Sequence, residues 1–346
     1  MTTAIVILNW NGESYLQQFL PTLIKYTSLS ETEIVVADNA STDSSLSILQ
    51  EKFPTIRTIV LDKNYGFAGG YNKALAQIKA DYYILLNSDV EVTPNWLEPL
   101  INYMNEHNEV AACQPKILSY FKQTYFEHAG AAGGYIDRFG FPFCRGRILG
   151  TAEEDKGQYD NIANIFWATG ACLVIRSEVF WKAGGLDDDF FAHMEEIDLC
   201  WRLKSRGFHI VCIPESTVFH VGGGTLNVES PYKTYLNFRN NLLMLYKNLP
   251  VKSLNSIMFW RFIFDYTAAF QLFITGKPKN AMSVFKARSD FKRMQSGFEE
   301  KRKQNILYST TDNQSDIFQK SIVIEYYLKR KRIFKLLLSD KSFQTK

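Results

Sequence analysis

The first 90 residues alternate between short apolar runs of strand length and segments with helical spacing. Strands are expected at residues 3–8, 33–37, 56–61 and 83–86, and helices at 15–26, 41–53 and 71–79. Ser41 or Thr42 is the expected cap of the second helix. This alternation predicts an α/β fold in which a mainly parallel sheet is flanked by helices. In such a sheet ligands bind outside the carboxyl ends of the strands, so the residues that end each run are the first candidates for a site.

Three of the expected strands end in polar residues. These are Asn9 and Asn11 after the first strand, Asp38 and Asn39 after the second, and Asn87, Ser88 and Asp89 after the fourth. A short motif that ends in a carboxylate suits a divalent cation held against a diphosphate. The alternative is an aspartate that only forms a turn after the strand.

A glycine-rich turn follows the third expected strand, at residues 64–70. A dinucleotide-binding fold needs G-x-G-x-x-G directly after its first strand, and that motif is absent there. Gly66, Gly69 and Gly70 instead favour a tight turn and a close approach of the backbone to a ligand. A turn without a ligand is the alternative.

The middle of the chain gives weaker signals. A helix is expected at 96–106 after Thr93-Pro94, a strand with a turn at 110–118, and an irregular region with room for a small hairpin at 119–165. Residues 167–176 predict a turn that leads into a strand. Ser177 is the expected cap of a short helix that Gly184-Gly185 ends.

A helix with an acidic first turn is expected from Glu195 to about Arg206. Asp198 and Arg202 lie four residues apart and can pair. Glu196 points about 100° away from that face and is free for another task. Beside the apolar pair Phe190-Phe191, its carboxylate could have a raised pKa and act as a general base. Acidic residues that only complement the helix dipole are the alternative.

Two strands are expected next, at 209–213 and 218–221, and a histidine lies near the end of the second. His220 borders the glycines 222–224 and could be a metal ligand opposite Asp89. A histidine that serves only in packing is the alternative.

Several of these segments occur together and in the order of a known family. The sequence resembles the family-2 glycosyltransferases of the GT-A fold, and among them the bacterial rhamnosyltransferase-like branch. The residues that carry the resemblance are 6–12, 37–43, 64–72, 86–89, 169–172, 195–202 and His220. The similarity extends over about residues 1–245.

The resemblance implies a nucleotide-sugar site and its residues. The nucleotide pocket would be lined by Leu8, Asn9, Trp10 and Asn11, and Asp38 would hydrogen-bond the base. The turn that approaches the nucleoside and sugar would include Asn64, Gly66, Gly70 and Asn72. The donor side would be completed by Asn87 and Ser88. Asn87-Ser88-Asp89 is similar to the family's D-x-D element, with Asn at its first acidic position. Asp89 and His220 would hold Mn²⁺ or Mg²⁺.

The resemblance also implies an inverting transfer. Gly170 and Ala171 would lie on the acceptor side, and Glu196 would be the base, with Glu195 as the lesser candidate. The expected donor is a UDP- or dTDP-sugar, with dTDP-rhamnose as one candidate. The expected acceptor is a glycan or a lipid-linked oligosaccharide in cell-surface polysaccharide synthesis. A sugar nucleotidyltransferase or a non-catalytic nucleotide-sugar-binding protein is the alternative.

The chain is expected to divide into a GT-A catalytic domain, residues 1–230, and a helical, basic C-terminal region, residues 231–346. In the second part, residues 232–246 predict a helix whose Arg239-Asn240-Asn241 lies near the acceptor or only packs on the catalytic domain. Residues 254–274 are very apolar but are interrupted by charges. They predict helices on or dipping into a membrane surface, with a core or homodimer contact as the alternative.

Charge and cysteine content bear on location. Residues 277–346 carry 17 Lys and Arg against 7 Asp and Glu, and their clusters 301–303 and 329–332 are expected to meet anionic headgroups. A nucleic-acid partner is not expected, because no recognition motif accompanies the basic tail. Five cysteines without a CxxC pair, and no signal peptide at the start, predict reduced thiols in the cytosol. The expected location is therefore cytoplasmic, peripheral on the inner face of the cytoplasmic membrane.

Overall fold

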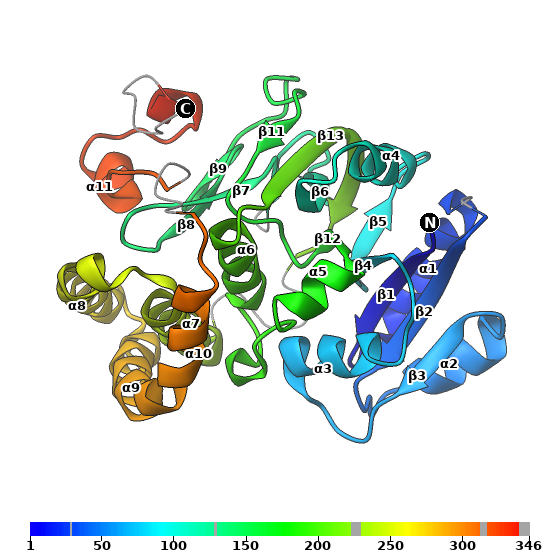
Figure 1. The fold of residues 1–346 in the computed structure, drawn as a ribbon, viewed down its shortest axis with the longest axis horizontal. Coiled ribbons are helices and arrows are strands. Elements are labelled where there is room, and N and C mark those ends of the chain that lie inside the picture. Colours follow the sequence, from blue (N-terminus) through cyan, green and yellow to red (C-terminus); the bar gives the residue numbers. More distant parts are fainter. Residues whose placement is uncertain (28–29, 128–129, 223–229, 312–316, 339–346) are drawn as a thin grey trace.

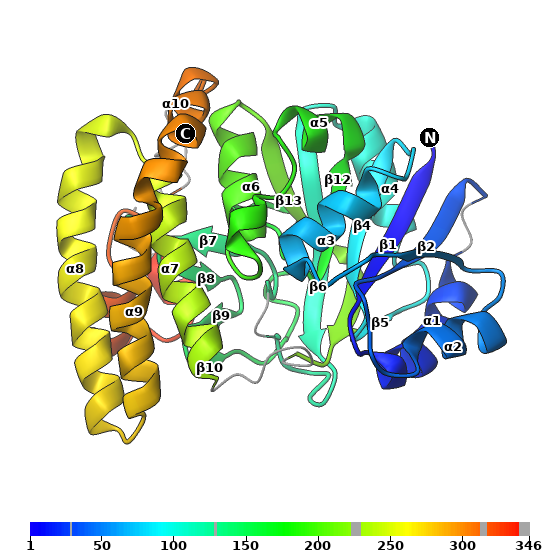
Figure 2. The same ribbon diagram turned by 90° about the horizontal axis from the view of Figure 1, so that it is seen from below.

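The computed structural model describes residues 1–27, 30–127, 130–222, 230–311 and 317–338. One large sheet runs through the molecule, and the C-terminal helices stand beside it (Figures 1 and 2). The strands of this sheet are β1 Thr3–Asn9, β2 Thr32–Asp38, β3 Arg57–Val60, β4 Tyr82–Asn87, β5 Val90–Val92, β6 Val110–Ser119, β11 Ala163–Asn164, β12 Cys172–Arg176 and β13 His209–His220.

The sheet is mainly parallel, as predicted. Its order is β11-β13-β6-β12-β4-β1-β2-β3, with β5 paired to β13. Strands β1 to β4 pair in parallel, and β12 is antiparallel to both β4 and β6. Since β13 is parallel to β6, six strands share one direction, and their carboxyl ends meet at one edge.

Helices cover both faces of the sheet because successive strand residues point to opposite sides. Ala4 and Val6 of β1 face the layer of α3 Gly66–Leu75, α5 Ser177–Lys182 and α6 Glu195–Ser205. Ile5 and Ile7 face the layer of α1 Glu13–Tyr26, α2 Ser45–Lys52 and α4 Glu98–Glu106. The two apolar layers hold the strand ends in fixed positions.

The region predicted to be irregular contains a second sheet. Its strands are β7 Gly134–Ile136, β8 Pro142–Cys144, β9 Arg147–Ile148 and β10 Thr151–Ala152, all antiparallel. Each strand has only two or three residues, too few to produce an alternating apolar pattern. Aromatic side chains cover the sheet, and Phe143 packs against Phe318 and Phe334 of the C-terminal segment.

The C-terminal region is helical, as predicted. It contains α7 Pro231–Asn248, α8 Val251–Ile274, α9 Pro278–Met294, α10 Glu299–Leu307, α11 Ile322–Tyr327 and α12 Lys335–Leu338. Helix α7 packs against α6 and α9, and α8 lies outermost against α9 (Figure 2). After α10 the chain returns to the small sheet, where Tyr326 bonds Thr151 at 2.8 Å. Helix α7 begins at Pro231, and the division of the chain into two domains there stays a prediction.

Several predicted local details are wrong. Ser41 and Thr42 do not cap α2, which begins at Ser45, because Ser41 instead bonds Asn9 and Asn11. Ser177 is the first residue of α5 rather than its cap.

Three element boundaries also differ from the prediction. Helix α3 includes the glycine turn and ends at Leu75, not at residue 79. The two expected strands at 209–221 form one strand, β13, with an irregularity between Ile213 and Thr217 where Pro214 lies. The apolar segment 254–274 forms one helix, α8, rather than several.

The charges that interrupt the apolar sequence of α8 form a buried cluster. Arg261 is 1% exposed and donates to Asp265 at 3.0 and 3.2 Å and to the carbonyl of Phe139 at 3.1 Å. Arg288 of α9 donates to the other oxygen of Asp265 at 2.6 Å. One face of α8 is therefore attached to the protein by paired charges.

Replacement of Asp265 by Ala should lower the free energy of unfolding by about 3–5 kcal/mol, because Arg261 and Arg288 would lose their common buried carboxylate. Glu178→Ala is the control; it removes an exposed pair with Lys182 and should cost less than about 1 kcal/mol. Urea denaturation of the three proteins measures both values. Equal small losses would contradict a structural role for the cluster.

Candidate active site

The nucleotide side of the predicted site lies at the carboxyl ends of β1 and β2. Asn9 and Asp38 are both fully buried, and the Asn9 amide donates to the Asp38 carboxylate at 3.0 Å. Asp38 also accepts the backbone N–H of Ser41 at 2.8 Å. Asn11 has a φ of 52° and bonds the Ser41–Thr42 turn, whereas the ring of Trp10 is exposed. Trp10 thus offers an open aromatic face beside an ordered polar cluster.

Two glycines at the start of α3 have no room for a side chain. A Cβ on Gly66, whose φ is +71°, would lie 2.5 Å from the carbonyl oxygen of Phe191, and a Cβ on Gly70 would lie 2.8 Å from Leu8. Asn64 accepts the N–H of Gly66 at 2.8 Å and the amide of Asn39 at 3.0 Å. The predicted residues Leu8, Asn64, Gly66 and Gly70 therefore lie together.

Asn72 is engaged with the chain rather than directed to an open space. Its amide donates to the carbonyl of Leu186 at 2.7 Å and to Asp188 at 2.5 Å, and its oxygen accepts the N–H of Leu186 at 3.0 Å. Asn72 joins α3 to the loop that precedes α6, an arrangement that sequence spacing did not predict.

Asp89 and His220 are in contact although 131 positions separate them. Strand β5 pairs with the end of β13, and His220 Nε2 lies 3.1 Å from Asp89 Oδ1. The amide of Asn87 lies 3.5 Å from the same imidazole nitrogen. The predicted metal ligands thus meet, with both side chains buried.

Glu127 completes this group and was missed from the sequence. Its carboxylate lies 3.2 Å from His220 Nδ1. Burial alone would lower the pKa of His220, but hydrogen bonds to Asp89 and Glu127 outweigh it and raise the pKa to about 10. A carboxylate on the far nitrogen is the usual arrangement of a metal-binding histidine. Among the described residues, however, no group of three or more His, Cys, Asp and Glu is arranged to hold a metal ion.

Glu195 and Glu196, the acidic pair, are the first two residues of α6. Burial raises the pKa of Glu196 to about 7 and raises the pKa of Glu195 well above its ordinary value, with the neighbouring Glu196 charge adding to the second effect. One oxygen of each carboxylate is buried and has no hydrogen-bond partner among the described residues. The arrangement provides a proton acceptor that works near neutral pH.

The side of α6 opposite Glu196 carries a buried charge cluster around the pair Asp198–Arg202, and Glu196 takes no part in it. Asp198 accepts from Arg202 at 2.9 Å, as predicted, and also from Lys247 at 2.8 Å and Asn248 at 2.7 Å. Lys247 bonds Asp187 at 2.5 Å as well. Helix α6 is thereby held to α7 and to the loop before it.

The expected acceptor-side residues lie between these groups. The carbonyl of Ala171 accepts the N–H of Asn87 at 3.0 Å, and a Cβ on Gly170 would lie 2.8 Å from the ring of Phe67 in α3. The preceding Ala168 donates to Cys200 of α6 at 3.4 Å. A continuous series of contacts therefore joins the metal-ligand pair, the glycine turn of α3 and the helix of Glu196.

Arg239 and Asn240 contact the loop 188–193, which precedes α6. Of the expected cationic segment 301–303, Lys301 bonds Asp187 and Asp189, and Arg302 is buried against the carbonyl of Tyr246. These two cations face the protein, so the expectation that the whole segment meets headgroups is wrong. All five cysteines are free and buried, as predicted.

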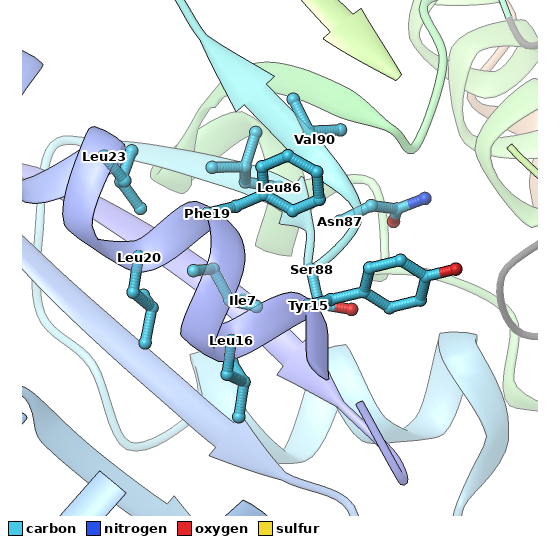
Figure 3. A pocket seen from close by; sticks show the side chains of 10 residues that line it. All are labelled: Ile7, Tyr15, Leu16, Phe19, Leu20, Leu23, Leu86, Asn87, Ser88 and Val90. Carbon is cyan, nitrogen blue, oxygen red and sulfur yellow. The ribbon is translucent and has the colours of Figure 1, made fainter. Parts of the chain in front are cut away.

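A small cavity of about 10 Å³ lies under α1, behind Asn87 and Ser88 (Figure 3). Ile7, Leu16, Phe19 and Leu20 are among its lining side chains, so most of its wall is apolar. A space of this size holds one water molecule at most. It therefore has no room for a sugar.

Solved glycosyltransferase structures share this architecture, which is a GT-A fold. The structure of S. aureus TarS 1–349 with UDP-GlcNAc superimposes with a TM-score of 0.54, at 15% identity, over 96% of this chain and 93% of that one. GalNAc-T7 with UDP, GalNAc and Mn²⁺ gives 0.55 at 17% identity, over 71% of this chain and 48% of that one. At these identities the likeness shows the fold alone.

The family follows from the sequence comparisons. The model of glycosyl transferase family 2 matches residues 4–184, more than half of the chain, so the chain belongs to this family. The protein is a glycosyltransferase, and this decides against the nucleotidyltransferase that the sequence left open.

Relatives within the family share about a quarter of their residues with this chain. An N-acetylglucosaminyl-diphospho-decaprenol L-rhamnosyltransferase of Mycobacterium tuberculosis is 25% identical over 231 residues, covering 62% of this chain and 75% of that protein. The dTDP-rhamnosyl transferase RfbF of Shigella flexneri is 23% identical over 258 residues, covering 70% and 79%. The hexosyltransferase Agl10 of Haloferax volcanii is 25% identical, covering 69% and 74%.

Proposed function

We propose that the protein transfers a sugar from a nucleoside diphosphate donor to a hydroxyl group of a glycan or lipid-linked acceptor, with inversion, in cell-surface polysaccharide synthesis. The observation that carries the proposal is the acidic pair with raised pKa values at the start of α6, joined by contacts to Asp89 and His220. The name of one relative, a dTDP-rhamnosyl transferase, favours dTDP-rhamnose as the donor. A UDP-sugar is the other candidate, because two solved structures of the same fold contain UDP or UDP-GlcNAc.

In the proposed reaction Glu196 acts as general base. It accepts the proton of the acceptor hydroxyl while that oxygen forms a bond to the anomeric carbon of the donor sugar. The bond between this carbon and the diphosphate oxygen breaks, and its electron pair leaves with the nucleoside diphosphate. Attack from the side opposite the leaving group inverts the configuration. Glu195, which is more deeply buried, is the alternative base.

The donor would bind along the carboxyl ends of the strands. Trp10 would stack on the base, and Asp38, Asn9 and Asn11 would shape the pocket around it. Gly66 and Gly70 would let the start of α3 approach the nucleoside and sugar, since neither position has space for a Cβ. Asn87 and Ser88 would face the diphosphate, and Gly170 and Ala171 the acceptor.

Asp89 and His220 fit a divalent cation, Mn²⁺ or Mg²⁺, as its two protein ligands. Glu127 supports this assignment because it holds the second nitrogen of the imidazole ring. A bound cation would neutralise the charge that develops on the departing diphosphate. Asn87 supplies no carboxylate, so donor oxygens would provide the other ligands.

Replacement of Glu196 by Gln should lower the transfer rate by about 10²- to 10⁴-fold, the usual contribution of a general base, while donor binding stays unchanged. In the unaltered enzyme the carboxylate must be ionised to accept a proton. Because its pKa is raised to about 7, kcat/KM should rise with pH up to about 7 and then level off. Steady-state rates from pH 5 to 9 measure this profile.

Glu300→Gln, on the exposed surface of α10, is the control for this substitution. Full activity in the Glu196→Gln protein would remove Glu196 from the role of base. A larger loss in Glu195→Gln than in Glu196→Gln would transfer that role to Glu195.

Replacement of Asp89 by Asn should weaken Mn²⁺-dependent binding of UDP or dTDP and lower turnover together, because only His220 would remain as a protein ligand. Titration calorimetry with each nucleotide, with and without Mn²⁺, measures the effect. Equal nucleotide affinity with and without Mn²⁺ in the unaltered protein would count against the proposed cation site. Glu91→Gln, two positions along β5, is the matched control.

We also propose that the protein works at the inner face of the cytoplasmic membrane and binds it through the α8–α9 hairpin. Helix α8 is long and apolar enough to cross a membrane by length and composition, and only 22% of its most apolar window is buried. The exposed apolar side chains of the hairpin are Val251, Phe259, Trp260, Phe262, Ile263, Phe270, Phe273, Ile274, Met282 and Phe285. The buried cluster of Arg261 and Asp265 favours a helix that lies along the surface.

The charges of the hairpin favour anionic lipid over a second copy of the chain. Residues 251–294 contain eight Lys and Arg and two Asp, and both aspartates, Asp265 and Asp290, are buried and paired. A two-fold dimer would place this cationic surface against itself. In Figure 2 the turn between α8 and α9 and the carboxyl end of β1 both lie toward the lower edge, at opposite sides of the view, so a membrane along that edge would face both.

Combined replacement of Phe270 and Phe273 by Glu should reduce binding to phosphatidylglycerol vesicles at least tenfold, because it removes apolar area and introduces anions. Vesicle sedimentation measures the binding, with phosphatidylcholine vesicles for comparison. Leu307→Glu, equally exposed on α10, is the control. A dimer in solution that these replacements dissociate would instead assign the hairpin to a second copy of the chain.

A further inference from the structure

The loop that leads into α6 has a rare backbone conformation. Phe191 has φ 65° and ψ −60°, and the N–H of Ala192 donates to the carbonyl of Phe190 at 2.8 Å. These values define a γ-turn of the strained, positive-φ kind. His193 and Met194 follow with φ values of 72° and 74°, so three residues other than glycine adopt left-handed conformations within four positions. Such residues persist only where their surroundings hold them.

One side of this loop is held by the start of α3. The carbonyl of Phe191 accepts the N–H groups of Phe67 and Ala68, at 2.6 and 3.2 Å. This is the same carbonyl that leaves no room for a Cβ on Gly66. The turn is therefore in direct contact with the segment proposed to bind the donor.

The other side of the loop is held by two neighbouring residues of α7. Arg239 donates to the carbonyls of Asp189 and Phe190, both at 3.1 Å. Asn240 of α7 is fully buried, and its Nδ2 lies 2.9 Å from the carbonyl oxygen of Phe190 and 2.8 Å from those of Ala192 and His193. The guanidinium of Arg239 donates to Asn240 Oδ1 at 2.8 Å, which fixes the amide with its N–H groups toward the loop.

The carbonyls of the loop thus divide between two partners. The Phe191 carbonyl faces α3, and the carbonyls on either side of it face Asn240. Without Asn240, the carbonyls of Phe190, Ala192 and His193 would lose this donor, and Arg239 would still donate only to the first of them. Rotation of the freed peptides toward water would undo the γ-turn. Met194 directly precedes α6, so the same change would reach the acidic pair.

We infer that Asn240 is a positioning residue for sugar transfer: it holds the strained turn that fixes the start of α6 against the donor-binding end of α3. The inference rests on the proposed role of Glu196. It places Arg239 and Asn240 next to the loop that positions the proposed base. Helix α7 is then needed for catalysis although it belongs to the C-terminal region.

The test compares Asn240→Ala and Asn240→Asp with Asn280→Ala. The Asp variant keeps the shape of the side chain but removes the donor group. Asn280 is a buried amide of α9 that contacts Thr234 of α7 and lies outside the loop, so its variant controls for loss of a buried amide. Hydrogen exchange of the segment 188–196 is measured first, because it needs no substrate. It should accelerate in both Asn240 variants and stay unchanged in Asn280→Ala.

Kinetics with dTDP-rhamnose and UDP-sugars as probes then separate positioning from folding. In both Asn240 variants kcat should fall about 100-fold, as expected for a small displacement of a catalytic group, while KM for the donor and the affinity for UDP or dTDP change less than threefold. Asn280→Ala should keep its kcat even if its melting temperature falls.

Two results would overturn the inference. One is unchanged exchange of the segment 188–196 in both Asn240 variants. The other is a kcat in Asn240→Asp close to that of the unaltered enzyme, which would show that the shape of the side chain suffices. A third result separates the two proposals. If exchange accelerates in the Asn240 variants but every protein is inactive, the unaltered one included, then Asn240 does hold the loop and the proposed reaction is wrong.

Discussion

The carboxylate of Asp198 is the contact on which the arrangement of the site depends. It has no access to water and is neutralised by Arg202 of its own helix and Lys247 of α7. This ion cluster fixes the rotation of α6 about its axis, so that Glu196 lies on the opposite side of the helix. Upstream, three left-handed residues cost on the order of 1–3 kcal/mol each, so the loop keeps its shape only because α3 and α7 hold it from both sides.

The proposed metal ligands Asp89 and His220 show how the chain places acidic groups around a histidine. Asn87 stands where a carboxylate would be expected, and its amide reaches the imidazole of His220 instead of supplying a charge. Glu127 restores a second acidic group on the other side of the ring. The negative charge around His220 therefore comes from two different parts of the chain, one directly before β5 and one beyond β6.

Features set by neighbouring residues could be predicted from the sequence, and features set by distant ones could not. The strands of the parallel sheet have strong apolar runs, and Asp198 and Arg202 are four residues apart, so both followed from local pattern. The small sheet of β7 to β10 has strands too short to show a period. Glu127 and Asn240 carry no local signal, because their partners lie 93 and 47–50 positions away.

The return of the chain to the small sheet sets an order on synthesis. Asp137 accepts the N–H groups of Phe139 and Phe141 from its own turn, and that of Ile322 from α11, 185 positions later. Phe318 is fully buried beside it. Because a ribosome delivers residues 317–322 long after residue 137, this corner must stay half assembled until that later segment has emerged.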